Sequence, residues 1–234
     1  MKRYLLLIAF ALLTTLNAGV KRYEVKSGII EYTITHSGNM MGMSMNGKGT
    51  AKTSFKEWGN IELHTEKSES VTMGMKEREQ VMTKIDNGKV FVVDFNKKVI
   101  YEYTPELLAN SEHKDLVKTG KKMLTAMGGK KIGQEEFMGY ECEVWSMMHV
   151  KIWLHKGIML KSEADMMGIK HTTVASKVNL DVPVSDKDLT LPDFPIKSAD
   201  EMMIPDNDLQ DSMPQLTPEQ MQQMQEMMKS FTAR

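Results

Sequence analysis

The chain has 234 residues, of which 23 are methionine and only one is cysteine. With 41% hydrophobic and 26% charged residues the composition is that of a globular protein, which excludes a disordered, a collagen-like or a multi-span membrane protein. The formal net charge is −1, so the chain lacks the basic surplus that binding to nucleic acid requires.

The N-terminus has the pattern of a secretory signal peptide. Lys2 and Arg3 precede an apolar run, Tyr4 to Leu13, that is too short to span a bilayer, and the small residue Ala18 ends the segment. We therefore expect residues 1–18 to be removed on export and the protein to be periplasmic or secreted. A transmembrane anchor is the alternative, but polar residues interrupt the apolar run. The remaining chain has 28 basic and 31 acidic side chains, which again predicts no nucleic-acid partner.

The segment from residue 27 to 103 reads as successive strands. Ile30, Tyr32 and Ile34 alternate with polar residues, which is typical of a strand with one buried face. Turns are predicted at Gly47-Lys48-Gly49 and, more strongly, at Asp86-Asn87-Gly88. These connections are too short for parallel crossovers, so the sequence predicts an antiparallel meander.

A helix is expected to interrupt the strands between Pro105 and Met127. Thr104 offers a capping hydroxyl before a first-turn proline, and Gly128-Gly129 is a C-terminal stop signal. Twenty-three helical residues would reach about 35 Å, long enough to cover a sheet. The helix is therefore a candidate lid.

Strands resume at Lys130 and continue to Asp181, and the composition changes after Pro195. The residues that follow are polar and rich in glutamine and methionine, which predicts a tail. Thr217-Pro218-Glu219-Gln220 begins a predicted short helix within that tail, with methionines along one face.

This order of parts resembles the fold of the periplasmic outer-membrane lipoprotein carriers and receptors, the LolA/LolB-like superfamily. It resembles more closely an uncharacterised group of secreted bacterial proteins that we associate with that superfamily. The resemblance extends from about Tyr23 to Ile196. The matching stretches are Tyr23 to Tyr32, Gly128 to Gly133, Gly139 to Cys142 and Trp153 to Leu160.

The resemblance implies a mainly antiparallel β fold with an inserted helix (α+β): a curved open half-barrel, covered by a helical lid and followed by a C-terminal helical tail. The corresponding division is a signal peptide at 1–18, a half-barrel domain at 19–196 and a tail at 197–234. The lipoprotein carriers hold acyl chains in the hollow, aided by an arginine on the sheet. Here Arg22, Arg78 and Arg234 are the only arginines after residue 18, and no local pattern identifies one of them as the equivalent.

We therefore expect a non-enzymatic, monomeric binding or carrier protein for an apolar ligand such as a lipid or acyl chain, with no cofactor. Unbranched methionine side chains suit an adaptable apolar lining. A helix packed permanently on the sheet, without a cavity, is the alternative interpretation of the same pattern. The candidates for the cavity and the lid are Leu116, Val117, Met123, Leu124, Met127, Tyr32, Ile34, Phe91, Trp145 and Trp153.

The clustered methionines also permit a different hypothesis, a periplasmic Cu(I) or Ag(I) binder. Thioethers are soft ligands that select Cu(I), and Met40, Met41, Met43 and Met45 lie in a stretch that we interpret as a polar loop, with His36 nearby. The competing interpretation is that the methionines form ordinary core or interface.

A third hypothesis is an envelope protein-interaction module that docks through the C-terminal methionine helix. Catalysis is not expected, because the chain has no G-x-S-x-G elbow, no H-E-x-x-H pair, no phosphate loop and no C-x-x-C. Cys142 alternates within a predicted strand, which predicts an inert buried thiol.

Overall fold

The computed structural model describes residues 21–40, 43–72, 74–104, 116–166 and 168–199. The predicted signal peptide, the first half of the predicted long helix and the C-terminal helix lie outside these residues, so they stay predictions. The chain divides into two units at Ser198, and the fold is that of the first unit.

Twelve strands form one sheet. Its order is β12-β6-β5-β4-β3-β2-β1-β11-β10-β9-β8-β7, and every neighbouring pair is antiparallel except β12 with β6. The strands are β1 (Gly28–Met40), β2 (Met43–Lys56), β3 (Ile61–Thr72), β4 (Met75–Asp86), β5 (Lys89–Asp94), β6 (Val99–Tyr103), β7 (Lys130–Phe137), β8 (Tyr140–Met147), β9 (Val150–His155), β10 (Ile158–Met166), β11 (Ile169–Leu180) and β12 (Ile196–Ser198).

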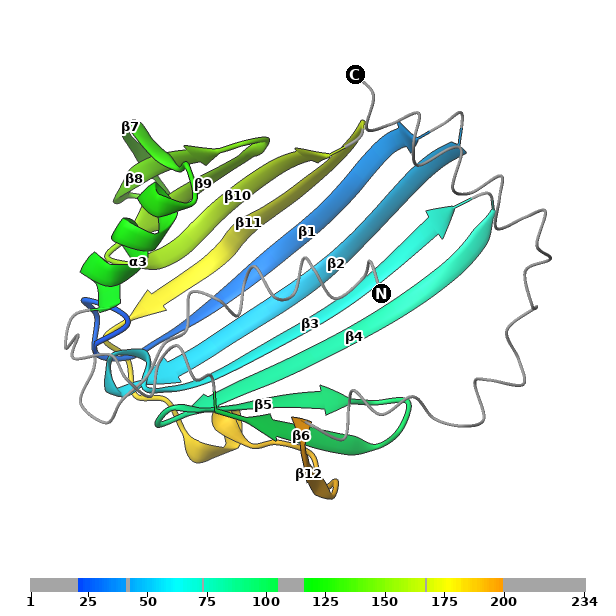
Figure 1. Ribbon diagram of the computed structural model, residues 1–234, viewed down its shortest axis with the longest axis vertical. Helices are drawn as coiled ribbons and strands as arrows, with labels where there is room; N and C mark the ends of the chain where they lie inside the picture. Colours follow the sequence, from blue (N-terminus) through cyan, green and yellow to red (C-terminus); the bar gives the residue numbers. More distant parts are fainter. Residues whose placement is uncertain (1–20, 41–42, 73, 105–115, 167, 200–234) are drawn as a thin grey trace. The chain divides into compact units, whose positions relative to one another are not determined.

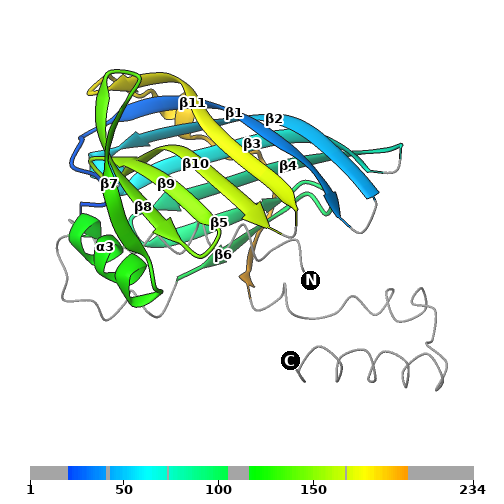
Figure 2. The ribbon, with the colours of Figure 1, turned by 90° about the horizontal axis from the view of Figure 1, so that it is seen from above.

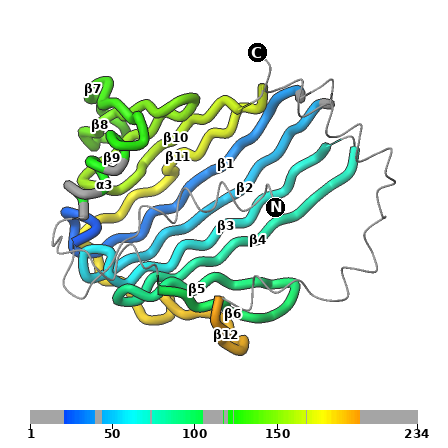
Figure 3. The backbone as a smooth tube through the Cα atoms, in the orientation of Figure 1, coloured from blue at the N-terminus to red at the C-terminus, as the bar shows by residue number. Residues whose placement is uncertain are grey.

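The sheet is open, because β12 and β7 are its two edges. Figures 1 and 2 show a strongly curved sheet in which β1 to β4 are the long central strands and β7 to β9 bend away beyond β10 and β11. The backbone trace in Figure 3 follows the same path. The predicted class, mainly antiparallel β with an unclosed sheet, is confirmed.

The tight turns follow from residues that tolerate left-handed backbone. Asn87 and Gly88 have φ of 48° and 97°, so the predicted hairpin turn between β4 and β5 is confirmed. The predicted turn at Gly47-Lys48-Gly49 is wrong, since β2 runs straight through it. A Cβ atom on Gly47 would lie 2.2 Å from the His36 ring, and one on Gly49 would lie 2.7 Å from the Lys67 carbonyl oxygen. These glycines thus permit close side-by-side packing rather than a turn.

The segment that precedes β1 ties two distant turns together. The N–H groups of Arg22 and Tyr23 donate to the carbonyl oxygen of Trp58, in the short helix η1 (Glu57–Gly59), over 2.9 and 3.0 Å. The next N–H, of Glu24, donates to the Lys156 carbonyl in the β9–β10 turn. The segment therefore bridges the β2–β3 connection and the β9–β10 hairpin, and it places Arg22 and Tyr23 at one end of the curved sheet.

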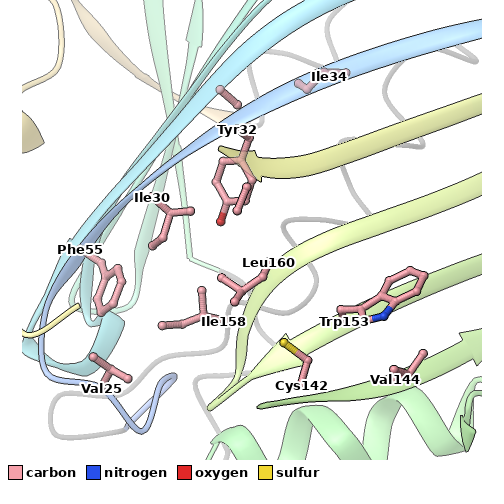
Figure 4. Close-up of a cluster of buried hydrophobic side chains, with 12 residues drawn as sticks. Val25, Ile30, Tyr32, Ile34, Phe55, Cys142, Val144, Trp153, Ile158 and Leu160 are labelled. Atoms are coloured by element: carbon pink, nitrogen blue, oxygen red, sulfur yellow. The ribbon is translucent and has the colours of Figure 1, made fainter. Parts of the chain in front are cut away.

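The main core lies toward the start of β1. Figure 4 shows its side chains, among them Ile30 from β1, Phe55 from β2, Leu160 from β10 and Cys142 from β8, all fully buried. Their burial stabilises this end of the curved sheet, where β1 and β2 meet β8 and β10. The buried Cys142 agrees with the prediction of an enclosed thiol, and burial raises its pKa.

The helix α3 (Leu116–Ala126) packs beside β8 and β9 (Figures 1 and 2). Its end is capped as predicted, because the Gly129 N–H donates to the Leu124 carbonyl and the Gly128 N–H donates to the Thr125 carbonyl. The described helix has 11 residues and is about 16 Å long, against the 23 expected, and residues 105–115 lie outside the described part. No helix in that part is long and apolar enough to cross a membrane.

Candidate ligand-binding site

A pocket lies between α3 and one face of the sheet, which we call the inner face. Strands β1 to β3 and the β9–β10 hairpin contribute one wall, and α3 contributes the other. Its volume is about 70 Å³. The lining residues are Arg22, Tyr23, Ile30, Tyr32, Thr53, Phe55, Glu62, Val117, Gly120, Leu124, Leu154, Gly157, Ile158 and Met159.

Most of the lining is apolar because successive strands turn the same face toward α3. Ile30 and Tyr32 alternate along β1, and Phe55 lies beside them on β2. From the other side, Leu124 of α3 packs against Trp145 and Leu154. The Tyr32 hydroxyl donates to the Met159 carbonyl over 2.9 Å, so even this polar atom is satisfied within the wall.

The pocket ends in a buried ion pair. Arg22 is 6% exposed and Glu62 is 4% exposed. One guanidinium nitrogen, Nη1, lies 3.2 Å from Glu62 Oε2 and donates to the Gly59 carbonyl over 2.8 Å. The Tyr23 hydroxyl donates to Glu62 Oε2 over 2.6 Å. The chain thus places a compensated charge pair at the end of an apolar space.

Ionisation at this end follows from burial and pairing. Burial alone would lower the pKa of Arg22, but the nearby Glu62 carboxylate outweighs it and raises the pKa, so the guanidinium stays charged. Burial raises the pKa of Tyr23 well above its usual value. Among the described residues, Nε of Arg22 is a buried donor without a hydrogen-bond acceptor. Because Arg22 lines the pocket, this N–H is an unsatisfied polar group beside it.

Only some of the residues predicted for the cavity and the lid line the pocket. Tyr32, Val117 and Leu124 line the pocket together. Ile34 and Trp153 are buried in the main core, and Trp145 is buried against Leu124. Phe91 lies on the opposite face of the sheet from Tyr32. It pairs with Lys84, which pairs with Leu63, whereas the inner-face residue of β3 at this point is the neighbouring Glu62. Met127 is 52% exposed, and the side chains of Leu116 and Met123 lie outside what the structure describes.

Sequence reasoning missed Arg22 and Glu62. Arg22 precedes the first strand, and its partners lie 37 and 40 residues away, so no local pattern links them. The alternation of Ile61, Glu62 and Leu63 suggests that Glu62 points to solvent. In the structure Glu62 instead lies on the inner face, beside its partner Phe55 on β2.

A second hollow, of about 330 Å³, lies against the short helix η2 (Asp186–Leu189). Two ion pairs line it, Lys56 with Asp186 and Lys84 with Asp86. It is larger than the pocket under α3, but its charged lining suits an apolar ligand less.

The predicted metal ligands are placed only in part. His36 lies on the inner face of β1, and Met45 lies on the same face of β2. Met41 lies outside the described residues, as do the side chains of Met40 and Met43. The interpretation of this stretch as a loop is wrong at both ends, because β1 extends to Met40 and β2 begins at Met43. The described residues contain no group of three His, Cys, Asp or Glu side chains arranged to hold a metal.

The chain matches no model of a protein family and no curated protein. Several solved structures are similar to it. An uncharacterized conserved protein from Thermus thermophilus has a TM-score of 0.39 and 6% identity, with 85% of this chain and 99% of that one covered. A LolA superfamily protein from Nitrosomonas europaea has a TM-score of 0.32 and 10% identity, covering 73% and 92%. For a putative outer membrane lipoprotein-sorting protein domain from Vibrio parahaemolyticus the values are 0.30 and 11%, covering 72% and 92%.

Proposed function

We propose that this protein is a non-enzymatic binding or carrier protein for an amphipathic ligand with an acyl chain, acting outside the cytoplasm after loss of residues 1–18. The observation that supports the proposal is the pocket beneath α3, which joins an apolar wall to a buried polar end. Burial of an acyl chain contributes about 0.8 kcal/mol per methylene, so such a site needs an apolar lining rather than a catalytic array.

The pocket must enlarge to accept this ligand. Its volume of about 70 Å³ is far below the roughly 300 Å³ at which small-molecule sites begin. The element best placed to move is α3, which is short and touches the sheet through Leu124 and through an ion pair of 2.9 Å between Lys121 and Glu143. We therefore assign α3 the role of a lid, whose displacement opens the apolar wall.

The polar end indicates the chemistry of the head group. The N–H at Arg22 Nε offers one hydrogen bond, while Glu62 already compensates the guanidinium charge. A second anion would be left without a counter-charge in a buried site, which is costly. A neutral acceptor, such as the carbonyl of an ester or amide, satisfies the donor without adding charge. Acyl esters are thus the proposed ligand class.

Binding is tested with a fluorescent acyl ester and the purified protein. Gly120 lines the pocket from α3, so Gly120→Phe should fill the space and weaken probe binding by about tenfold or more, the equivalent of about two buried methylenes. Ala126→Phe, at an exposed position of the same helix, is the matched control and should bind normally. Absence of probe binding by the unaltered protein would sink the proposal.

The head-group assignment is tested separately by competition. A long-chain methyl ester and the alkane of equal length should displace the probe with different affinities, the ester being preferred by the roughly 0.5–1.5 kcal/mol of one hydrogen bond. Equal competition by the two compounds would remove the role given to Arg22 while leaving the apolar pocket intact.

A further inference from the structure

Four hairpins turn at the same end of the sheet, the end away from the apolar pocket. They join β1 to β2, β3 to β4, β8 to β9 and β10 to β11, and Figures 1 and 2 show the ends of β1, β3 and β10 directed to the same side. The Asn39 N–H donates to the Gly168 carbonyl over 3.3 Å, and the Asp165 N–H donates to the His149 carbonyl over 3.0 Å. Strands β2 and β3 remain paired up to Thr72, the last residue of β3. The four hairpin ends therefore lie side by side along one rim of the sheet.

Methionine is concentrated in the sequence of these four connections. The segments are Met40-Met41-Gly42-Met43, Met73-Gly74-Met75, Met147-Met148-His149 and Met166-Met167-Gly168, which contain nine of the 23 methionines of the chain. Where the structure describes the side chains, the outermost ones are exposed: Met148 by 87%, Met75 by 66% and Met166 by 47%. Such exposed side chains bury little apolar surface in the fold, so a row of them indicates a contact outside the molecule.

A lysine follows each of the four hairpin ends. The first formally charged residue after each one is, in chain order, Lys48, Lys76, Lys151 and Lys170, and all four are exposed. The strand register places these lysines on the outer face of the sheet, opposite the inner face on which Met75 and Met166 lie. We call the three exposed methionines and the four lysines the methionine rim. The rim thus has an apolar inner side and a cationic outer side.

The charge around the methionine rim differs in sign from that of the whole chain. Residues 37–48, 69–78, 144–151 and 165–170 carry five basic and three acidic side chains, a net charge of +2, whereas the whole chain has −1. Of the three acids, Glu69 is held by Arg78 at 3.0 Å and by Lys76 at 3.7 Å. The rim is therefore complementary to an anionic surface.

We propose that the methionine rim docks on an anionic lipid bilayer, with its methionine side chains inserted at the boundary of the acyl chains and its lysines at the phosphates. Binding to a bilayer depends on buried apolar area together with attraction to anionic lipids, and the rim offers both. Separate projecting tips need no matching pocket in a bilayer, and unbranched thioethers adapt to its irregular surface. Pairing with the rim of a second copy would instead set lysines against lysines, which is unfavourable.

This inference goes beyond the acyl-ester proposal and does not rest on it, because no residue of the methionine rim lines the pocket under α3. The two proposals also fail separately. Loss of vesicle binding concerns the rim, whereas loss of binding of the soluble fluorescent ester concerns the pocket.

Docking is tested by sedimentation of the purified protein with vesicles of phosphatidylethanolamine and phosphatidylglycerol. The protein should bind these vesicles, and high salt or replacement of both lipids by phosphatidylcholine should weaken binding. The double variant Met75→Ser with Met148→Ser should weaken it by about tenfold, because less apolar area is buried. Lys76→Gln and Lys170→Gln should each weaken it by about fivefold, the effect of one lysine near an anionic surface.

A matched control comes from exposed apolar residues elsewhere on the sheet. Met138 lies in the β7–β8 turn, at the opposite end of β8 from Met148, and has nearly the same left-handed backbone, with φ of 53° against 51°. Ile196 lies on the edge strand β12. These side chains are 47% and 57% exposed. The double variant Met138→Ser with Ile196→Ser should bind vesicles normally, and thermal unfolding establishes that each variant is folded.

The position of the contact is tested with a polarity-sensitive dye on Met148→Cys. The native thiol, Cys142, is fully buried and does not compete for the dye in the folded protein. Anionic vesicles should shift the emission of this dye to shorter wavelength, whereas the same dye on Met138→Cys should not respond. Three outcomes would each overturn the proposal: no binding of the unaltered protein to anionic vesicles, equal weakening by the rim and control double variants, or a dye response at position 138 and none at 148.

Discussion

The inner face of the sheet has two unlike halves. Toward the start of β1 it is mainly apolar, with Ile30, Phe55 and Ile85 fully buried beside the Arg22–Glu62 ion pair. Toward the other end of the same strands it carries His36 and His171, whose Nδ1 atoms lie 3.1 Å apart, and the partly exposed Ser68 and Ser70 of β3. One set of strands thus builds a core in one half and a solvated polar surface in the other. The pocket therefore occupies only the first part of these strands, although β1 continues to Met40.

The substitution expected to have the largest effect on stability is Phe55→Ala in the apolar half. Phe55 is fully buried, and its ring packs at 4.7 Å between centroids against Tyr23. The cavity left behind should lower the free energy of unfolding by about 3–5 kcal/mol. Ser70→Ala, on the inner face of the polar half, should change it by no more than about 0.5 kcal/mol. Urea denaturation measures both, and similar losses would mean that the two halves do not differ as described.

Arg22→Met should have the next largest effect. It leaves the Glu62 carboxylate buried without its counter-charge, which costs about 3 kcal/mol; the value is at the lower end of the usual range because Tyr23 still donates to Glu62. The double variant Arg22→Met with Glu62→Leu should recover much of the loss, as measured by the same denaturation. A double variant as unstable as the sum of the two single ones would contradict this account.

A smaller effect is expected from acid at α3. Burial disfavours ionisation of Glu143, but hydrogen bonds from Lys121, Lys131 and Trp145 outweigh it and lower the pKa to about 2. A carboxyl group with a lowered pKa stabilises the fold above its unfolded pKa of about 4.3, and this contribution disappears as the pH falls toward 2.

We therefore expect α3 to loosen between about pH 4.3 and pH 2, with faster hydrogen exchange of its amides than of those in β1. Glu143→Gln should loosen the helix at neutral pH and remove this acid dependence. An unchanged exchange rate of α3 across that range in the unaltered protein would show that the Lys121–Glu143 ion pair does not hold α3 on the sheet.

Local patterns predicted much of the fold. The alternation of Ile30, Tyr32 and Ile34 and the Asn87-Gly88 turn gave the strands and a hairpin, because both depend on residues near in sequence. Gly47 and Gly49 of β2 led to the wrong prediction of a turn. In a sequence, a glycine that permits close packing within a strand cannot be distinguished from one that permits a turn.

The candidate sites were predicted less well, because they depend on distant pairing. Tyr32, Val117 and Leu124 were predicted from their apolar spacing and lie together. The partners of Arg22 and the pairing of His36 with His171 depend on segments brought together by sheet register and by the bridge before β1. A single sequence carries no local signal for such contacts.

The two edges of the sheet are built in a way that opposes pairing with a strand of another chain. An open sheet offers unpaired backbone groups on which another chain can add a strand. Here one edge, β12, is only three residues long, and the other, β7, carries four charged side chains and a register irregularity opposite β8. Both features oppose strand addition. The open sheet is thereby protected at both edges from becoming a template for aggregation.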